Sequence, residues 1–156
     1  KSIFMSMNKQ QIRESLRNRL LESESKEISA GVLIMCTKTN KVLLLLRSSE
    51  GRNGNTWSLL SGGIEDGETP LEGLKREVTE EISIDPDIIE YKFINNIDTG
   101  DSNKEFHYYE GFTSSEFIAK LDHENTDYKW VSKGELPSPL YPKLKEKLNN
   151  IWKSQI

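Results

Sequence analysis

Apolar residues recur along the chain at regular spacings, separated by short polar segments, and this pattern predicts most of the secondary structure. Helical spacing within residues 8–22 predicts an N-terminal amphipathic helix, followed by a polar linker at 23–26. A second helix is predicted from Tyr141 onwards, because four apolar residues share one of its faces: Leu144, Leu148, Ile151 and Trp152. We therefore expect helices near both ends of the sequence.

Between these helices lie β-branched and leucine-rich runs of strand length. They occupy residues 28–37, 41–47, 57–60, 91–98, 105–113 and 128–132. Short turns at 38–40 and 99–103 join two pairs of these runs into predicted hairpins. Several strands interrupted by one central helix predict an α/β (α+β) fold in which helices pack on a sheet.

The central helix has a clear start signal. Thr69 is the expected N-cap, Pro70 suits the first helical position, and Glu72 completes a capping box. The helix is expected to end near Ser83, after a core-facing stripe of four apolar residues: Leu71, Leu74, Val78 and Ile82.

Composition narrows the class of protein. The 156 residues have 29% charged and 35% hydrophobic side chains, as globular proteins do, and are divided here into an N-terminal segment (1–27) and one globular domain (28–156). A formal charge of −4 argues against general nucleic-acid binding. The single cysteine, Cys36, favours a reducing compartment, and no apolar run reaches transmembrane length, so we expect a cytoplasmic protein without a membrane partner.

Residues 62–82 carry seven acidic side chains in 21 positions. Three of them, Glu77, Glu80 and Glu81, stand at i, i+3 and i+4 and converge on one helix face. Like charges at this spacing destabilise a helix by roughly a few tenths of a kcal/mol per pair, which suggests a compensating cation. Oxygen ligands favour Mg²⁺ or Mn²⁺. The alternative is a solvated helix face that binds no metal.

A longer pattern favours the metal site: Gly62, then Glu68, then Arg76-Glu77, then Glu80-Glu81. Over residues 62–84 it resembles the Nudix box, the signature of the Nudix hydrolases. The resemblance implies a Nudix-type α/β/α sandwich with a mixed sheet and a loop–helix–loop catalytic segment. It also implies Mg²⁺- or Mn²⁺-dependent hydrolysis of a pyrophosphate bond in a substrate built on a nucleoside diphosphate. Ser61 and Ser83 replace the family's usual proline and glycine without removing a ligand.

The resemblance further implies roles for individual residues. The metal ligands would be Glu77, Glu80, Glu81 and the backbone carbonyl of Gly62. Arg76 would hold a glutamate by an ion pair, and Glu68 would help to order the site.

Glu124 lies in the polar loop before the last predicted strand. Many Nudix enzymes use a glutamate from a comparable loop at the metal site, where it binds a second cation or takes a proton from water. We therefore predict this catalytic role for Glu124, with three competing acids nearby: Glu110, Asp122 and Asp127.

Arg47 and Arg52 are the candidates for binding substrate phosphates, and the alternative is that they are ordinary surface arginines. The expected partner is a small-molecule nucleotide, with a nucleoside triphosphate favoured. Three alternatives stay open: an ADP-ribose pyrophosphatase, a dinucleoside polyphosphate pyrophosphatase, and a non-catalytic nucleotide-binding regulatory module. The sequence also leaves open whether the protein is a monomer or a homodimer.

Overall fold

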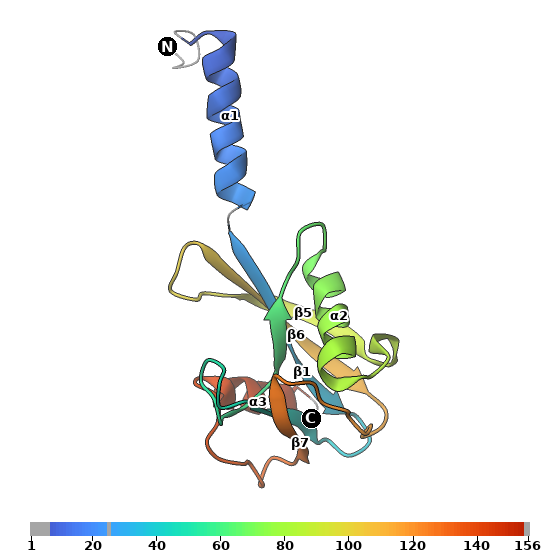
Figure 1. The fold of residues 1–156 in the computed structure, drawn as a ribbon. Coiled ribbons are helices and arrows are strands. Elements are labelled where there is room, and N and C mark those ends of the chain that lie inside the picture. Colours follow the sequence, from blue (N-terminus) through green and yellow to red (C-terminus); the bar gives the residue numbers. More distant parts are fainter. Residues whose placement is uncertain (1–6, 25, 155–156) are drawn as a thin grey trace.

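The computed structural model describes residues 7–24 and 26–154, and Figure 1 shows their arrangement. The described strands form one mixed sheet in the order β3-β2-β1-β6-β5, while β4 pairs with β1 and β7 pairs with β2. The strands are β1 (Glu27–Cys36), β2 (Val42–Arg47), β3 (Trp57–Ser58), β4 (Leu60–Gly63), β5 (Glu90–Ile97), β6 (Lys104–Thr113) and β7 (Asn125–Val131).

Strand β1 is the centre of the sheet. It runs parallel to β6 in register from Glu27↔Lys104 to Cys36↔Thr113, and antiparallel to both β2 and β4. Strands β5 and β6 are antiparallel, so both predicted hairpins are confirmed. The parallel pair makes the sheet mixed, as the family resemblance implies.

The two faces of the sheet are covered by different helices. On one face, α2 (Pro70–Ile82) packs Leu74, Val78 and Ile82 against alternate residues of β1. On the other, α3 (Leu144–Lys153) packs Leu148 and Ile151 in a second buried cluster. Burying each large apolar side chain stabilises the fold by about 1.5–3 kcal/mol. The predicted helix–sheet–helix sandwich is confirmed.

Helix α2 begins and ends where the sequence predicts. The Thr69 hydroxyl accepts a hydrogen bond from Glu72 N–H, and the Glu72 carboxylate accepts one from Thr69 N–H, which completes the capping box. At the other end Ser83 is the C-cap, with φ 56° and ψ 40°, and its N–H donates to the Thr79 carbonyl. A serine therefore occupies a left-handed conformation that favours glycine.

The predicted strand at 57–60 is instead two strands. Trp57–Ser58 pairs with β2, whereas Leu60–Gly63 pairs with β1, so the chain changes partner at Leu59. The side chains of Leu59 and Phe106 both lie over Gly31, where a Cβ would approach each of them within 2.6 Å. The absence of a side chain at Gly31 makes room for this crossing.

Other boundaries differ from the prediction. Strand β7 begins at Asn125 instead of 128, and α3 begins at Leu144 rather than Tyr141. A short 3₁₀ helix, η2 (Pro86–Ile88), was not predicted.

Near the N-terminus, α1 (Lys9–Glu24) runs into the predicted linker and extends away from the sheet (Figure 1). Its Leu16 side chain is exposed. Residues 1–6 of the predicted N-terminal segment and residue 25 of the linker lie outside the described residues. Within the described ranges, no helix has the length and apolar character needed to span a bilayer.

The left-handed conformation of Ser83 gives a stability prediction. The substitution Ser83→Gly should raise the free energy of unfolding by about 0.5–1 kcal/mol, because glycine adopts positive φ without steric strain. Urea unfolding measures the change. The matched control is Ser154→Gly at the C-cap of α3, where φ is −71° and glycine brings no relief. Equal effects of both substitutions would contradict the prediction.

Candidate metal and nucleotide site

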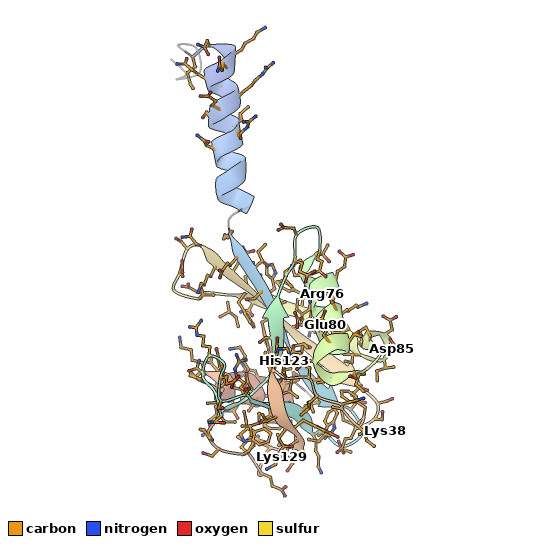
Figure 2. The ribbon with its side chains drawn as sticks, viewed as in Figure 1. Lys38, Arg76, Glu80, Asp85, His123 and Lys129 are labelled. Atoms are coloured by element: carbon orange, nitrogen blue, oxygen red, sulfur yellow. The ribbon has the colours of Figure 1, made fainter. Side chains whose placement is uncertain are left out.

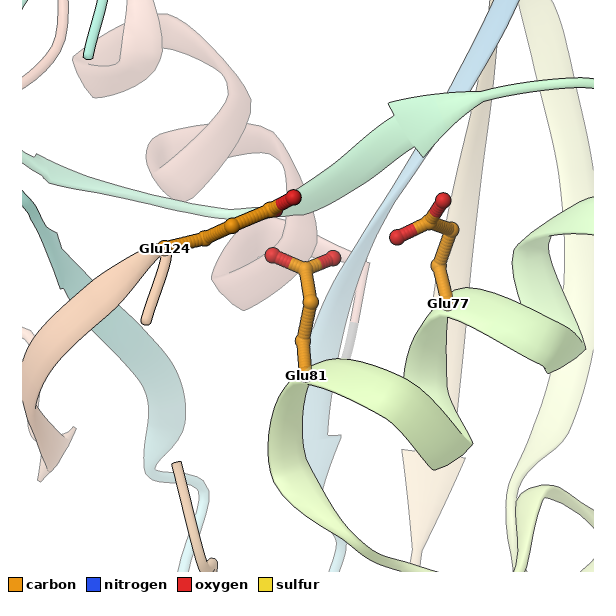
Figure 3. A group of neighbouring side chains, drawn as sticks. All are labelled: Glu77, Glu81 and Glu124. Atoms are coloured by element: carbon orange, nitrogen blue, oxygen red, sulfur yellow. The ribbon is translucent and has the colours of Figure 1, made fainter. Parts of the chain in front are cut away.

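Three carboxylates from two parts of the chain meet beside the sheet. Glu77 and Glu81 stand one turn apart on α2. Glu124 is the residue just before β7, and its side chain points towards them (Figure 3). Each offers an oxygen atom, and these three atoms lie within 4.8 Å of one another. The structure therefore brings Glu124 to the glutamate face of the helix, whereas Glu110, Asp122 and Asp127 are not part of this group.

Two of these carboxylates are buried, with exposed fractions of 8% for Glu77 and 3% for Glu81. Burial raises the pKa of both groups, and the neighbouring Glu124 charge raises that of Glu81 further. Glu81 Oε1 accepts a hydrogen bond from Asn125 Nδ2 at 3.1 Å, but its Oε2 has no partner among the described residues. A buried, unpartnered carboxylate oxygen beside other carboxylates fits a divalent cation.

The backbone of β4 passes close to the same carboxylates. A Cβ at Gly62 would lie 2.5 Å from Glu77 Oε1, so a larger residue at this position would displace the Glu77 carboxylate from its observed place. Gly62 also lines the same cavity as Glu81 and Glu124. This close approach is consistent with the predicted use of the Gly62 carbonyl as a ligand.

Arg76 organises the other side of the acidic segment. Its guanidinium group donates to both carboxylate oxygens of Glu68, at 2.8 and 3.0 Å, and to the Gly63 carbonyl at 3.0 Å. It also donates to Glu77 Oε1 at 3.0 Å and to Glu80 Oε2 at 3.1 Å. The hydrogen bond from Arg76 is the main cause of a lowered pKa at Glu68. Arg76 thus ties the loop to the helix, as the ion pair implied by the resemblance would.

Glu80 is placed differently from the other two helix glutamates. Its side chain projects from α2 beside Arg76 (Figure 2), is 54% exposed and lies outside the three-carboxylate group. The ligand role of Glu80 stays a prediction.

Sequence reasoning missed Asn125, whose buried amide holds Glu81. Two backbone hydrogen bonds dock the preceding segment on the end of α2: Lys120 N–H to Ile82 O, and Asp122 N–H to Glu81 O. A third, from Ser48 N–H to the Glu124 carbonyl, joins this segment to the loop after β2. The only sequence signal for Asn125 was its place beside Glu124.

Gly62, Glu81, Glu124 and Asn125 line a cavity of about 1360 Å³. Arg47 and Arg52 line the same cavity. Arg47 Nε donates to the Arg52 carbonyl at 2.9 Å, and its guanidinium carbon lies 5.4 Å from the centre of the Tyr141 ring. Arg47 is therefore held in place rather than freely solvated. Two of the three clustered carboxylates, Glu81 and Glu124, thus share one cavity with both predicted phosphate-binding arginines.

Comparison with known protein families identifies the family of this chain. Residues 25–151 match the family model described as NUDIX domain. The chain belongs to the NUDIX domain family. The motif at 62–84 thus lies in a NUDIX domain that includes the sheet and most of α3.

The individual NUDIX relatives match only part of this chain. A protein named 8-oxo-dGTP diphosphatase from Proteus vulgaris is 38% identical over 66 residues, which cover 42% of this chain and 57% of that protein. An RNA pyrophosphohydrolase from Nitratiruptor sp. is 30% identical over 118 residues, or 59% of this chain and 73% of that protein. The chain thus spans little more than half the length of the first relative.

Among solved structures, the NUDIX domain of Shewanella oneidensis NrtR, in complex with ADP ribose, superposes with a TM-score of 0.71 at 18% identity. The match covers 96% of this chain and 100% of that one. At this identity the comparison shows a common fold.

Glu81→Gln tests the metal site without an activity assay. The substitution should weaken Mn²⁺ binding by about tenfold or more, because it removes the charge of a buried ligand. Isothermal titration calorimetry measures the dissociation constant. Glu90→Gln, at an exposed position on β5, is the control and should bind Mn²⁺ as the wild type does. Equal affinity in the Glu81→Gln variant would exclude Glu81 as a ligand.

Glu81→Gln should weaken Mn²⁺ binding, but it should stabilise the fold when divalent cations are absent. The folded state raises the pKa of Glu81, so it binds more protons than the unfolded state and loses stability as pH rises above about 4.5. Glutamine imitates the protonated form. We expect Glu81→Gln to be more stable than the wild type at about pH 8 and to show a flatter dependence of stability on pH. Urea unfolding across pH, with a chelator present, measures both.

Proposed function

We propose that the protein is a Mg²⁺- or Mn²⁺-dependent pyrophosphohydrolase that acts on a nucleoside triphosphate-type substrate. One observation carries the proposal: Glu81, which has an unpartnered buried carboxylate oxygen, lines the same cavity as Glu124 and two arginines. Such a cavity offers a cation site and phosphate-binding groups together, which hydrolysis of an anionic pyrophosphate requires.

Glu77, Glu80, Glu81 and the Gly62 carbonyl would hold the metal, with Glu124 as a further ligand or as the base. When bound, a divalent cation neutralises phosphate charge and lowers the pKa of water. Glu80 would join by rotating away from Arg76, which would still retain its paired contacts to Glu68.

The chain's own residues would perform the remaining steps. Arg47 and Arg52 would bind phosphate oxygens, with Arg47 oriented by Tyr141 and by the Arg52 carbonyl. Glu124 would take a proton from the attacking water while the oxygen of that water forms a bond to phosphorus. The bridging P–O bond breaks, and the electron pair leaves with the departing phosphate group.

The favoured substrate class draws support from the relatives. The Proteus protein is named for a nucleoside triphosphate and the Nitratiruptor protein for RNA pyrophosphate hydrolysis. The ADP ribose complex comes from a structure that shares only the fold, so the ADP-ribose alternative gains less support. Turnover of a nucleotide panel in Mg²⁺, comprising nucleoside triphosphates, ADP-ribose, dinucleoside polyphosphates and 5′-triphosphate RNA, would decide among them. Binding without turnover would instead favour a regulatory module.

Glu124→Gln tests the proposed proton acceptor. We expect kcat to fall on the order of 10²-fold or more with little change in KM, because glutamine keeps the shape but cannot accept the proton. Steady-state kinetics at saturating Mg²⁺ measure both constants. Glu116→Gln, at an exposed acid earlier in the same connecting segment, is the control. A Glu124→Gln variant within a few-fold of wild type would exclude Glu124 as the base.

A further inference from the structure

Four lysines that the proposed chemistry does not use also line the cavity: Lys26, Lys104, Lys143 and Lys147. Lys147 projects from α3, is half-buried and lines the cavity. Its Nζ lies 5.6 Å from the centre of the Tyr108 ring on β6. No carboxylate of the described residues lies within ion-pair distance of this Nζ, so the ammonium group lacks a counter-charge there.

The position of Lys147 is fixed by the packing of its helix. Leu144, Leu148 and Ile151 are buried against the sheet, so the residue between them is held at the cavity edge. Burial lowers the pKa of the Lys147 ammonium below its ordinary value. A partly desolvated ammonium with no anionic partner is stabilised by a ligand that supplies a strong hydrogen-bond acceptor.

The surroundings of Lys147 favour a base over a phosphate as that ligand. Phe106 lies two residues before Tyr108 on the same face of β6 and faces Ile97 in register on β5. Phe106 and Leu59 cover the backbone at Gly31, which pairs with Tyr108. Leu59, Ile97 and Phe106 all line the cavity, so this part of its floor is apolar and partly aromatic. Such a floor suits a flat base better than a multiply charged phosphate.

We propose that Lys147 selects the nucleobase by donating a hydrogen bond to an exocyclic carbonyl oxygen. The cavity would then prefer oxo bases, either 6-oxopurines or 4-oxopyrimidines, over their amino counterparts. An amino group in the same position is a donor and leaves the ammonium unpartnered. The proposal deepens the proposed function and rests on it, since it assigns the part of the substrate distant from the metal site.

Matched pairs of nucleotides test this assignment. ITP and ATP differ chiefly in a 6-oxo or 6-amino group, and UTP and CTP differ in the same way at position 4. The kcat/KM of the wild type should favour the oxo member by about tenfold or more in at least one pair, and that pair identifies the base class. Lys147→Met, which keeps the length of the side chain without its donors, should abolish the preference mainly through KM.

Lys145→Met is the control, because Lys145 is exposed on the same helix and does not line the cavity. It should retain the preference. Calorimetric dissociation constants for the corresponding α,β-methylene analogues give a second readout that needs no turnover and should show the same loss in Lys147→Met.

Each other outcome has a distinct meaning. A wild-type enzyme without oxo preference, or a preference that survives Lys147→Met, would overturn the assignment of Lys147 and leave the proposed function intact. An equal loss for all four nucleotides would overturn it in favour of phosphate binding. Absence of turnover with selective, Lys147-dependent binding of the analogues would overturn the proposed function and support the base site. Absence of both would overturn both.

Discussion

The arrangement of the acidic segment depends on the hydrogen bonds made by the guanidinium group of Arg76. This group joins α2 to the preceding loop through Glu68 and the Gly63 carbonyl, and it also reaches Glu77 and Glu80. Without an internal cation, the acids of the loop and helix would repel one another across this junction. Because the loop is held, the backbone at its start can lie against the Glu77 carboxylate.

Arg76 divides the acidic residues into two electrostatic groups. Glu68 and Glu80 form ion pairs with the Arg76 guanidinium group. Glu81 and Glu124 converge on the inner side without a basic partner of their own in the described structure. Arg76 therefore balances the charge of Glu68 and Glu80, whereas the charge of Glu81 and Glu124 is left for a bound metal ion to balance. Glu77 belongs to both groups, so it couples the order of the loop to metal binding.

The sequence predicts features set by local chemistry. The capping box fixed the start of α2, and its apolar stripe indicated which face meets the sheet. Features set by distant partners were not predictable. The break at Leu59 depends on which strand each side pairs with, and the burial of Asn125 depends on a helix 44 positions away in sequence. Glu80 shows the same limit, because helical spacing cannot tell which carboxylate an arginine will hold.

The hydrogen bond between Ser48 N–H and the Glu124 carbonyl links two walls of the cavity that carry different tasks. One wall is the loop that bears Arg52, and the other presents the acid beside the helix glutamates. An insertion or deletion in that loop would thus displace the backbone of the acid as well as the arginine. Evolutionary changes in the length of this loop would therefore be expected to alter the reaction rate and the substrate range together.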